Sequence, residues 1–269
     1  MGSEREAYLP RALIDRILRS ATADVVLVGG QALAFWMDRF GIEHRTGQPA
    51  VSRDIDFFTP DAANSAPLHR FAEAIDGEAR IVDSRALTAL IGSAVAPAQG
   101  ELVYNVDLLH AVFGLDREDV IANAMEVSSP DGALFLVMHP LDVLQSRNAN
   151  LHTLREKQNS LGEQQFRLSI EVARAWLESE FGAIAADPQR SVRARERAVL
   201  ALIGAVVEYA KADAAKKNAA RYGIHLADAI PAWRVGAPAF WDKQWPNLRQ
   251  RMSPAYAKQC EERALRGQA

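Results

Sequence analysis

Hydrophobic and polar positions are arranged differently in the two halves of this chain. Up to about residue 140, short apolar runs are separated by polar turns that contain glycine or proline. This pattern predicts strands interleaved with helices. We expect strands within residues 24–30, 52–59, 79–83, 86–92, 101–114 and 131–139, and helices over residues 7–20, 31–40 and 66–75.

From Pro140 onward, apolar residues recur mainly at helical spacing. Helices are expected within residues 140–154, 162–181, 191–223 and 245–265. Strands and helices followed by helices alone predict the α+β class. We therefore expect a domain over residues 1–140 with a mixed sheet and flanking helices, and an all-helical domain over residues 141–269.

Composition narrows the class of protein. The chain has 269 residues, of which 49% are hydrophobic, and this is enough for a sizeable core. A single cysteine, Cys260, excludes an internal disulfide and a cysteine-rich zinc site. Apolar runs stay shorter than the roughly 18 residues of a membrane span, and the N-terminus lacks an apolar signal segment. We expect a cytoplasmic protein with no membrane partner.

The formal net charge of −3 conceals an asymmetry between the two halves. Residues 1–150 carry 12 Lys and Arg against 21 Asp and Glu, whereas residues 151–269 carry 19 against 13. An acidic half is suited to metal ions and a basic half to a polyanion such as RNA. Solvated helix faces of either sign are the alternative interpretation.

Two aspartates, Asp54 and Asp56, stand two residues apart in the apolar segment SRDIDFF. On a strand, residues i and i+2 point to the same face, so the two carboxylates repel each other unless a cation lies between them. Asp-x-Asp also arises by chance, and a strand end that exposes carboxylates to water is the alternative.

A third aspartate, Asp107, lies in the middle of the expected strand ELVYNVDLLHAVFG. A lone carboxylate there is costly unless it has a partner. If this strand pairs beside SRDIDFF, then Asp54, Asp56 and Asp107 converge as three oxygen ligands for Mg²⁺ or Mn²⁺, and substrate phosphates complete the shell. The alternative for Asp107 is a salt bridge to Arg53 or Arg85.

Two glycines, Gly29 and Gly30, end the apolar strand DVVLVGG, and a helix is expected to begin near Gln31. Free N–H groups at a helix N-terminus bind anions, and glycine allows a phosphate to approach the backbone. The segment is neither a Walker loop nor a dinucleotide-binding fingerprint. A tight turn without a ligand is the alternative.

Together, the segments VGGQALAFW, SRDIDFF and VYNVDLL resemble the polymerase-β-type nucleotidyltransferase superfamily over about residues 20–115. Within it they look most like the AbiEii/MenT type of nucleotidyltransferase toxins. The resemblance implies Mg²⁺-dependent transfer of a nucleotide from an NTP, with a helical C-terminal part that helps to bind the acceptor. It implies metal ligation and catalysis by Asp54, Asp56 and Asp107, and nucleotide binding by Gly29, Gly30 and Gln31.

Two features of the chain depart from the family pattern. Residues 37–50 form an insertion near the expected site, and Arg147 stands where the toxin type tends to have a lysine. An arginine binds phosphate but does not readily act as a base, so we expect Arg147 to contact the nucleotide phosphates. An exposed charge on a helix is the alternative.

Three function classes follow from these features. The first is a nucleotidyltransferase that moves an NMP from an NTP to an acceptor hydroxyl, as a toxin or defence component with an antitoxin partner. The basic half favours RNA or tRNA over protein as acceptor. The second is a catalytically inactive binding or regulatory protein of a toxin–antitoxin type pair. The third is an Asp-x-Asp glycosyltransferase, against which the glycine pair and the third carboxylate strand argue.

Overall fold

A computed structural model describes residues 5–43, 53–83, 85–129, 132–231 and 240–252, and residues 258 and 262 singly. The chain divides into two compact units, residues 1–146 and 147–269. The boundary lies six residues after the expected position, within helix α5 (Pro140–Thr153). Half of the expected insertion over residues 37–50, namely residues 44–50, lies outside the described residues.

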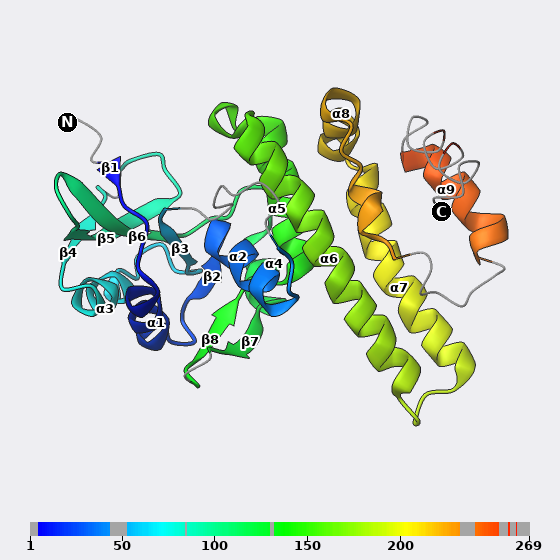
Figure 1. Cartoon of the computed structure of the whole chain (residues 1–269), viewed down its shortest axis with the longest axis horizontal. Coiled ribbons are helices and arrows are strands. Elements are labelled where there is room, and N and C mark those ends of the chain that lie inside the picture. The colour runs from blue at the N-terminus through cyan, green and yellow to red at the C-terminus, as the bar shows by residue number, and fades with distance from the viewer. Residues whose placement is uncertain are drawn as a thin grey trace. The chain divides into compact units, whose positions relative to one another are not determined.

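The first unit is built on one mixed sheet, which confirms the predicted α+β class (Figure 1). The strands follow the order β4-β5-β6-β3-β2-β8-β7, and β1 pairs with β6. β3 and β6 are parallel, as are β2 and β8, whereas β2 and β3 are antiparallel. The strands are β1 (Arg5–Glu6), β2 (Val26–Val28), β3 (Ile55–Phe58), β4 (Glu78–Ile81), β5 (Leu90–Pro97), β6 (Leu102–Leu109), β7 (Met125–Ser128) and β8 (Leu134–Val137).

The helices that the described residues form wholly within this unit are α1 (Arg11–Ser20), α2 (Gly29–Arg39), α3 (Ala66–Ala74) and α4 (Arg117–Ala122). The pattern of the sequence did not predict β1, α4 or β7. β1 has two residues and α4 six, which is too short for a periodic signal. In β7 only Val127 is buried, so no apolar alternation marks the strand.

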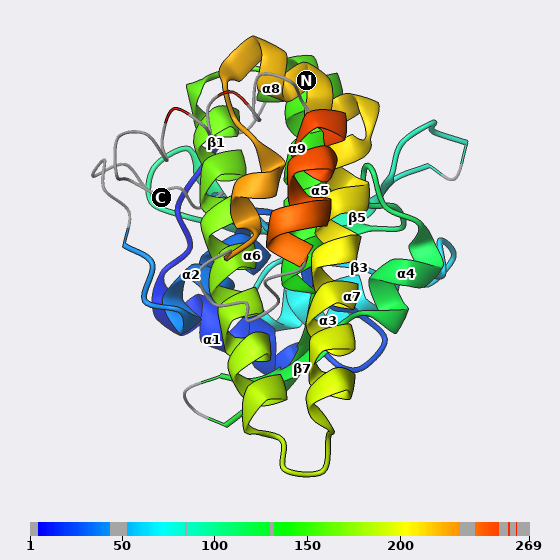
Figure 2. The ribbon, with the colours of Figure 1, turned by 90° about the vertical axis from the view of Figure 1, so that its right-hand side faces the viewer.

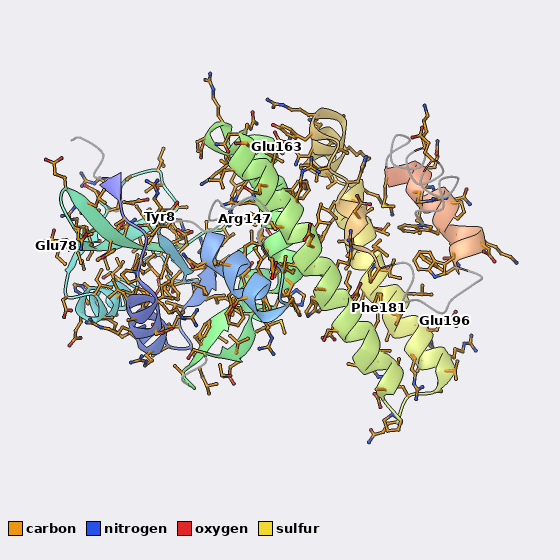
Figure 3. The ribbon with its side chains drawn as sticks, viewed as in Figure 1. Tyr8, Glu78, Arg147, Glu163, Phe181 and Glu196 are labelled. Carbon is orange, nitrogen blue, oxygen red and sulfur yellow. The ribbon has the colours of Figure 1, made fainter. Side chains whose placement is uncertain are left out.

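The core of this unit lies between the sheet and its helices. Ile55 and Phe57 on β3 are fully buried, and their register partners on β6 are the buried Val106 and Leu108. Phe57 stacks on Phe71 of α3 with ring centroids 4.5 Å apart. Because side chains alternate along a strand, the residues between them point to the other face of the sheet. Figure 3 shows how densely side chains fill this unit.

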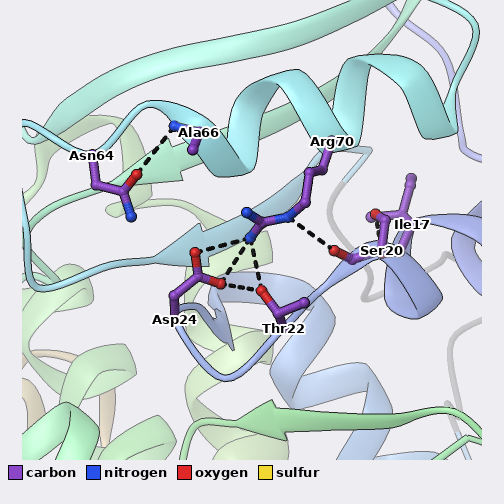
Figure 4. A network of polar contacts seen from close by, with 7 residues as sticks. All are labelled: Ile17, Ser20, Thr22, Asp24, Asn64, Ala66 and Arg70. Carbon is purple, nitrogen blue, oxygen red and sulfur yellow. Dashed lines mark hydrogen bonds and ion pairs between the residues drawn. The ribbon is translucent and has the colours of Figure 1, made fainter.

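Arg70 on α3 fixes the connection between α1 and β2 (Figure 4). Its guanidinium donates to the Ser20 carbonyl at 3.3 Å, to Thr22 Oγ1 at 2.9 Å and to both Asp24 oxygens at 2.7 and 2.9 Å. Burial raises the pKa of Asp24, but hydrogen bonds from Thr22 and Arg70 outweigh it and hold that pKa below its usual value. The contacts therefore anchor the residues that lead into β2.

Helices make up the described elements of the second unit. They are the end of α5, the 3₁₀-helices η1 (Arg155–Lys157) and η2 (Leu226–Ala229), the π-helix η4 (Phe240–Gln244), and α6 (Ser160–Ala186), α7 (Val192–Lys211), α8 (Asp213–Tyr222) and α9 (Trp245–Met252). α6 and α7 lie side by side (Figures 1 and 2). That the whole of this part is helical stays a prediction, because it includes residues outside those described.

Helix ends in this unit have identifiable causes. The Asn159 side chain accepts from the Gly162 N–H at 2.9 Å and caps α6, and Ser191 caps α7 in the same way. The single helix expected over residues 191–223 is broken at Ala212, which has an extended backbone with ψ 150°. Asp213 then stands in the first turn of α8, where the helix dipole favours a negative charge. No described helix is both long and apolar enough to cross a membrane.

Arg70→Ala removes the anchor of the α1–β2 connection. We expect it to lower the free energy of unfolding by about 1–2 kcal/mol, because hydrogen bonds to charged groups are lost at a partly exposed position. Urea denaturation measures this value. Arg80→Ala is the control, since Arg80 pairs with Glu78 on an exposed edge strand. An equal effect of both substitutions would contradict the anchoring role.

Asp142 gives a pH-dependent prediction. Its side chain is 2% exposed in the first turn of α5 and accepts from Asn123 Nδ2 at 3.2 Å. Burial raises its pKa to about 6. In the unfolded chain Asp142 ionises near pH 4, so between about pH 4 and 6 the folded state binds more protons and its stability falls as pH rises.

Asp142→Asn abolishes this titration. We expect the variant to match the wild type near pH 4 and to exceed its free energy of unfolding by about 1–3 kcal/mol at pH 7.5. Urea denaturation at a series of pH values measures the difference. Asp38→Asn, at an exposed position of α2, is the control for loss of one carboxylate. An offset for Asp142→Asn that does not change with pH would contradict the assignment.

Candidate metal centre

Three carboxylates meet on one face of the sheet. Asp56 on β3 is the direct register partner of Asp107 on β6, so both side chains point the same way. Asp54 stands one residue before β3. One carboxylate oxygen from each of the three lies within 4.8 Å of the others. The predicted pairing of the two strands and the convergence of Asp54, Asp56 and Asp107 are therefore confirmed.

The carboxylates of this site destabilise one another electrostatically. All three aspartates are half-buried. Burial raises the pKa of Asp107 and the charge of Asp54 raises it further, whereas hydrogen bonds from Ser93 and Asn105 lower it. Carboxylates this close destabilise one another's charged forms, and a bound cation offsets that cost.

Two neutral donors hold Asp107. Ser93 Oγ donates to Asp107 Oδ1 at 2.6 Å, and Asn105 Nδ2 donates to the same oxygen at 2.9 Å. Ser93 is the register partner of Asp107 on the antiparallel strand β5, and Asn105 precedes it by two residues on β6. These contacts take the place of the salt bridge to Arg53 or Arg85 that was the alternative for Asp107. Arg53 instead lies over the Tyr8 ring at 5.2 Å from its centroid.

A fourth carboxylate, Glu6, lies next to this group. Strand β1 pairs with β6 and places Glu6 Oε1 3.5 Å from Asn105 Nδ2. Burial raises the pKa of Glu6, and the charges of Asp54 and Asp107 raise it further. Sequence reasoning missed Glu6 and Ser93, because their proximity to Asp107 depends on strand pairing. Asn105 was detectable, since it shares a strand face with Asp107.

Gly29 is required by the geometry of the site. Its φ of +69° lies in the left-handed region, and a Cβ built on it would stand 1.9 Å from Asp56 Oδ2. Helix α2 begins at this residue, two positions before Gln31, where it was expected. The positive end of the helix dipole therefore lies beside the Asp56 carboxylate.

The other predicted nucleotide-binding residues lie on helices. Gly30 is buried in the first turn of α2, and the half-buried Gln31 follows it. Gln31 lines a cavity of about 120 Å³ together with apolar residues and with Arg11, Asp38 and Ser129. Contacts of Gly29, Gly30 and Gln31 with a nucleotide stay predictions.

Arg147 lies on α5 within the second unit (Figure 3). Its side chain is 6% exposed, and Nη1 donates to Gln165 Oε1 on α6 at 3.2 Å. The contact helps to join α5 to α6. Nucleotide binding by Arg147 stays a prediction.

The three aspartates fit a Mg²⁺ or Mn²⁺ ion. Carboxylate oxygens are hard ligands, and Mg²⁺ is typically bound through one or two carboxylates, waters and substrate phosphates. Asp56 and Asp107 come from paired strands, which hold their side chains more rigidly than loops do. The arrangement is therefore suited to a cation that also binds phosphates.

Gly29→Ala should disrupt the metal centre, because the new methyl group would displace Asp56. We expect Mn²⁺ affinity, measured by electron paramagnetic resonance titration, to fall at least about tenfold, the size of effect typical when the support of a ligand is lost. Gly41→Ala is the matched control. Gly41 also has a left-handed φ, +63°, but a Cβ there has nothing within 4 Å. Equal losses in both variants would show that backbone strain alone is responsible.

No protein-family model matches the sequence, and a search of curated proteins found no relative.

Proposed function

We propose that this protein is a metal-dependent nucleotidyltransferase that moves an NMP from an NTP to an acceptor hydroxyl. The observation that carries the proposal is the convergence of Asp54, Asp56 and Asp107 within 4.8 Å. The glycine-initiated helix beside Asp56 supports it, because a helix N-terminus next to a metal centre suits a triphosphate.

The chain supplies position and charge for this reaction. Asp54, Asp56 and Asp107 would hold Mg²⁺, which when bound would neutralise charge on the triphosphate and lower the pKa of the attacking hydroxyl. The acceptor oxygen forms a bond to the α-phosphorus as the bond from that phosphorus to the β-phosphate oxygen breaks. Pyrophosphate leaves, and the proton of the hydroxyl passes to solvent water. Such transfers need little covalent chemistry from the protein, so positioning and charge neutralisation at the three aspartates would supply most of the catalysis.

The proposed acceptor is RNA, because residues 151–269 carry an excess of six positive charges. Arg193 and Arg197 lie exposed, one turn apart on α7, and are candidates for phosphate contact. Arg190 pairs with Asp187 at 3.0 Å, and Arg195 donates to the Asp187 carbonyl. These contacts favour a structural role for both arginines over phosphate contact. A toxin role with an antitoxin partner rests on the resemblance alone.

Label transfer tests the proposal. The protein is incubated with each α-³²P-labelled NTP, Mg²⁺ or Mn²⁺, and total RNA or cell lysate. We expect label on RNA, and Asp107→Asn should reduce the transfer rate by about 10²–10³-fold, because loss of transition-state electrostatics has effects of this size. Asp116→Asn, an exposed change of the same kind before α4, should leave the rate unaltered.

Two results would contradict the proposal. Transfer that persists in Asp107→Asn would place the chemistry elsewhere. Nucleotide binding without transfer under any NTP would favour the catalytically inactive regulatory protein. Transfer to protein or to a small molecule would keep the activity and exclude RNA as the acceptor.

A further inference from the structure

We propose that Ser93 and Asn105 are positioning residues that reserve one oxygen of Asp107 for the cation. The inference rests on the proposed metal centre and goes beyond it, because it assigns a role to two neutral side chains and a mode of ligation to Asp107. Both side chains donate a hydrogen bond to Asp107 Oδ1, Ser93 through Oγ at 2.6 Å and Asn105 through Nδ2 at 2.9 Å.

The two donors approach from rigid elements. Ser93 lies directly across from Asp107 in the β5–β6 ladder, and Asn105 lies on β6 itself. Asn105 is buried at 9% exposure, and its amide is also 3.5 Å from Glu6 Oε1 on β1. Three paired strands, β1, β6 and β5, therefore form the frame around one carboxylate. Donors on such a frame hold a ligand more tightly than donors on loops.

The hydrogen bonds fix the rotation of the carboxylate. The terminal torsion of aspartate is broad and nearly two-fold, so a free Asp107 would exchange its two oxygens. An ionised carboxylate accepts at about four positions over two oxygens. The two donors occupy the accepting positions of Oδ1. Oδ2 is therefore the oxygen that would coordinate a cation. Asp107 would then bind through one oxygen.

One-oxygen ligation has a consequence for ion choice. Mg²⁺ and Mn²⁺ are compatible with single carboxylate oxygens in an octahedral shell, whereas Ca²⁺ takes six to eight oxygens and readily accepts both oxygens of a carboxylate. Loss of a donor to Oδ1 should weaken binding of the smaller ions more than binding of Ca²⁺. Ser93 would thereby contribute to selectivity without touching the metal.

Binding of Mn²⁺ to the full chain tests the inference directly. Electron paramagnetic resonance gives the Mn²⁺ dissociation constant, and competition gives that of Ca²⁺. We expect Ser93→Ala to raise the Mn²⁺ constant about tenfold, the lower end of the range for partners of metal ligands, and to raise the Ca²⁺ constant less. Ser93→Thr keeps the hydroxyl and should restore both values. Ser128→Ala, on the edge strand β7, is the matched control and should change neither.

A double-mutant cycle separates positioning from a general structural effect. If Ser93 acts through Asp107, Ser93→Ala should add less than about twofold in the Asp107→Asn background, because no carboxylate remains to be oriented. An equal effect in both backgrounds would overturn the inference. Wild-type Mn²⁺ binding by Ser93→Ala would overturn it too, while the proposed function stands. If the wild-type chain does not bind Mn²⁺ through Asp107, both the inference and the proposed function are contradicted.

Discussion

Repulsion among the carboxylates of Asp54, Asp56 and Asp107 is the constraint on which the rest of this site depends. Asp56 and Asp107 are register partners on neighbouring parallel strands, and like charges this close destabilise each other's charged forms. Asp54 adds a third negative charge at the same point. The surrounding structure reduces this cost with the N-terminus of α2 beside Asp56 and with neutral donors on Asp107. Residual repulsion is what a divalent cation would offset.

The opposite face of the same strands supplies the stability that this arrangement requires. Ile55, Phe57, Val106 and Leu108 are fully buried there, and each contributes about 1.5–3 kcal/mol by leaving water. Arg70 anchors the approach to β2, at whose end Gly29 allows the backbone to pass close to Asp56. A stable core on one face thus permits a costly cluster of charge on the other.

The sequence predicts the parts of this site that depend on local spacing. Asp54, Asp56 and Asp107 could be found because alternation along a strand fixes which side chains share a face, and the apolar residues between them mark the strands. Gly29 could be found because a glycine pair ends an apolar run, although the helix begins two residues earlier than expected. Ser93 and Glu6 could not be found, since their contacts arise from pairing with strands elsewhere in the chain. The break at Ala212 was equally hidden, because alanine favours a continuous helix.

The position of a bound cation tests the central claim most directly. Crystals grown with Mn²⁺ and a non-hydrolysable NTP analogue would give an anomalous diffraction signal from the ion. We predict a peak about 2 Å from carboxylate oxygens of Asp56 and Asp107, with phosphate oxygens on its open side. A fully occupied Mn²⁺ or nucleotide bound away from these aspartates would contradict the proposed nucleotidyltransferase centre on this face.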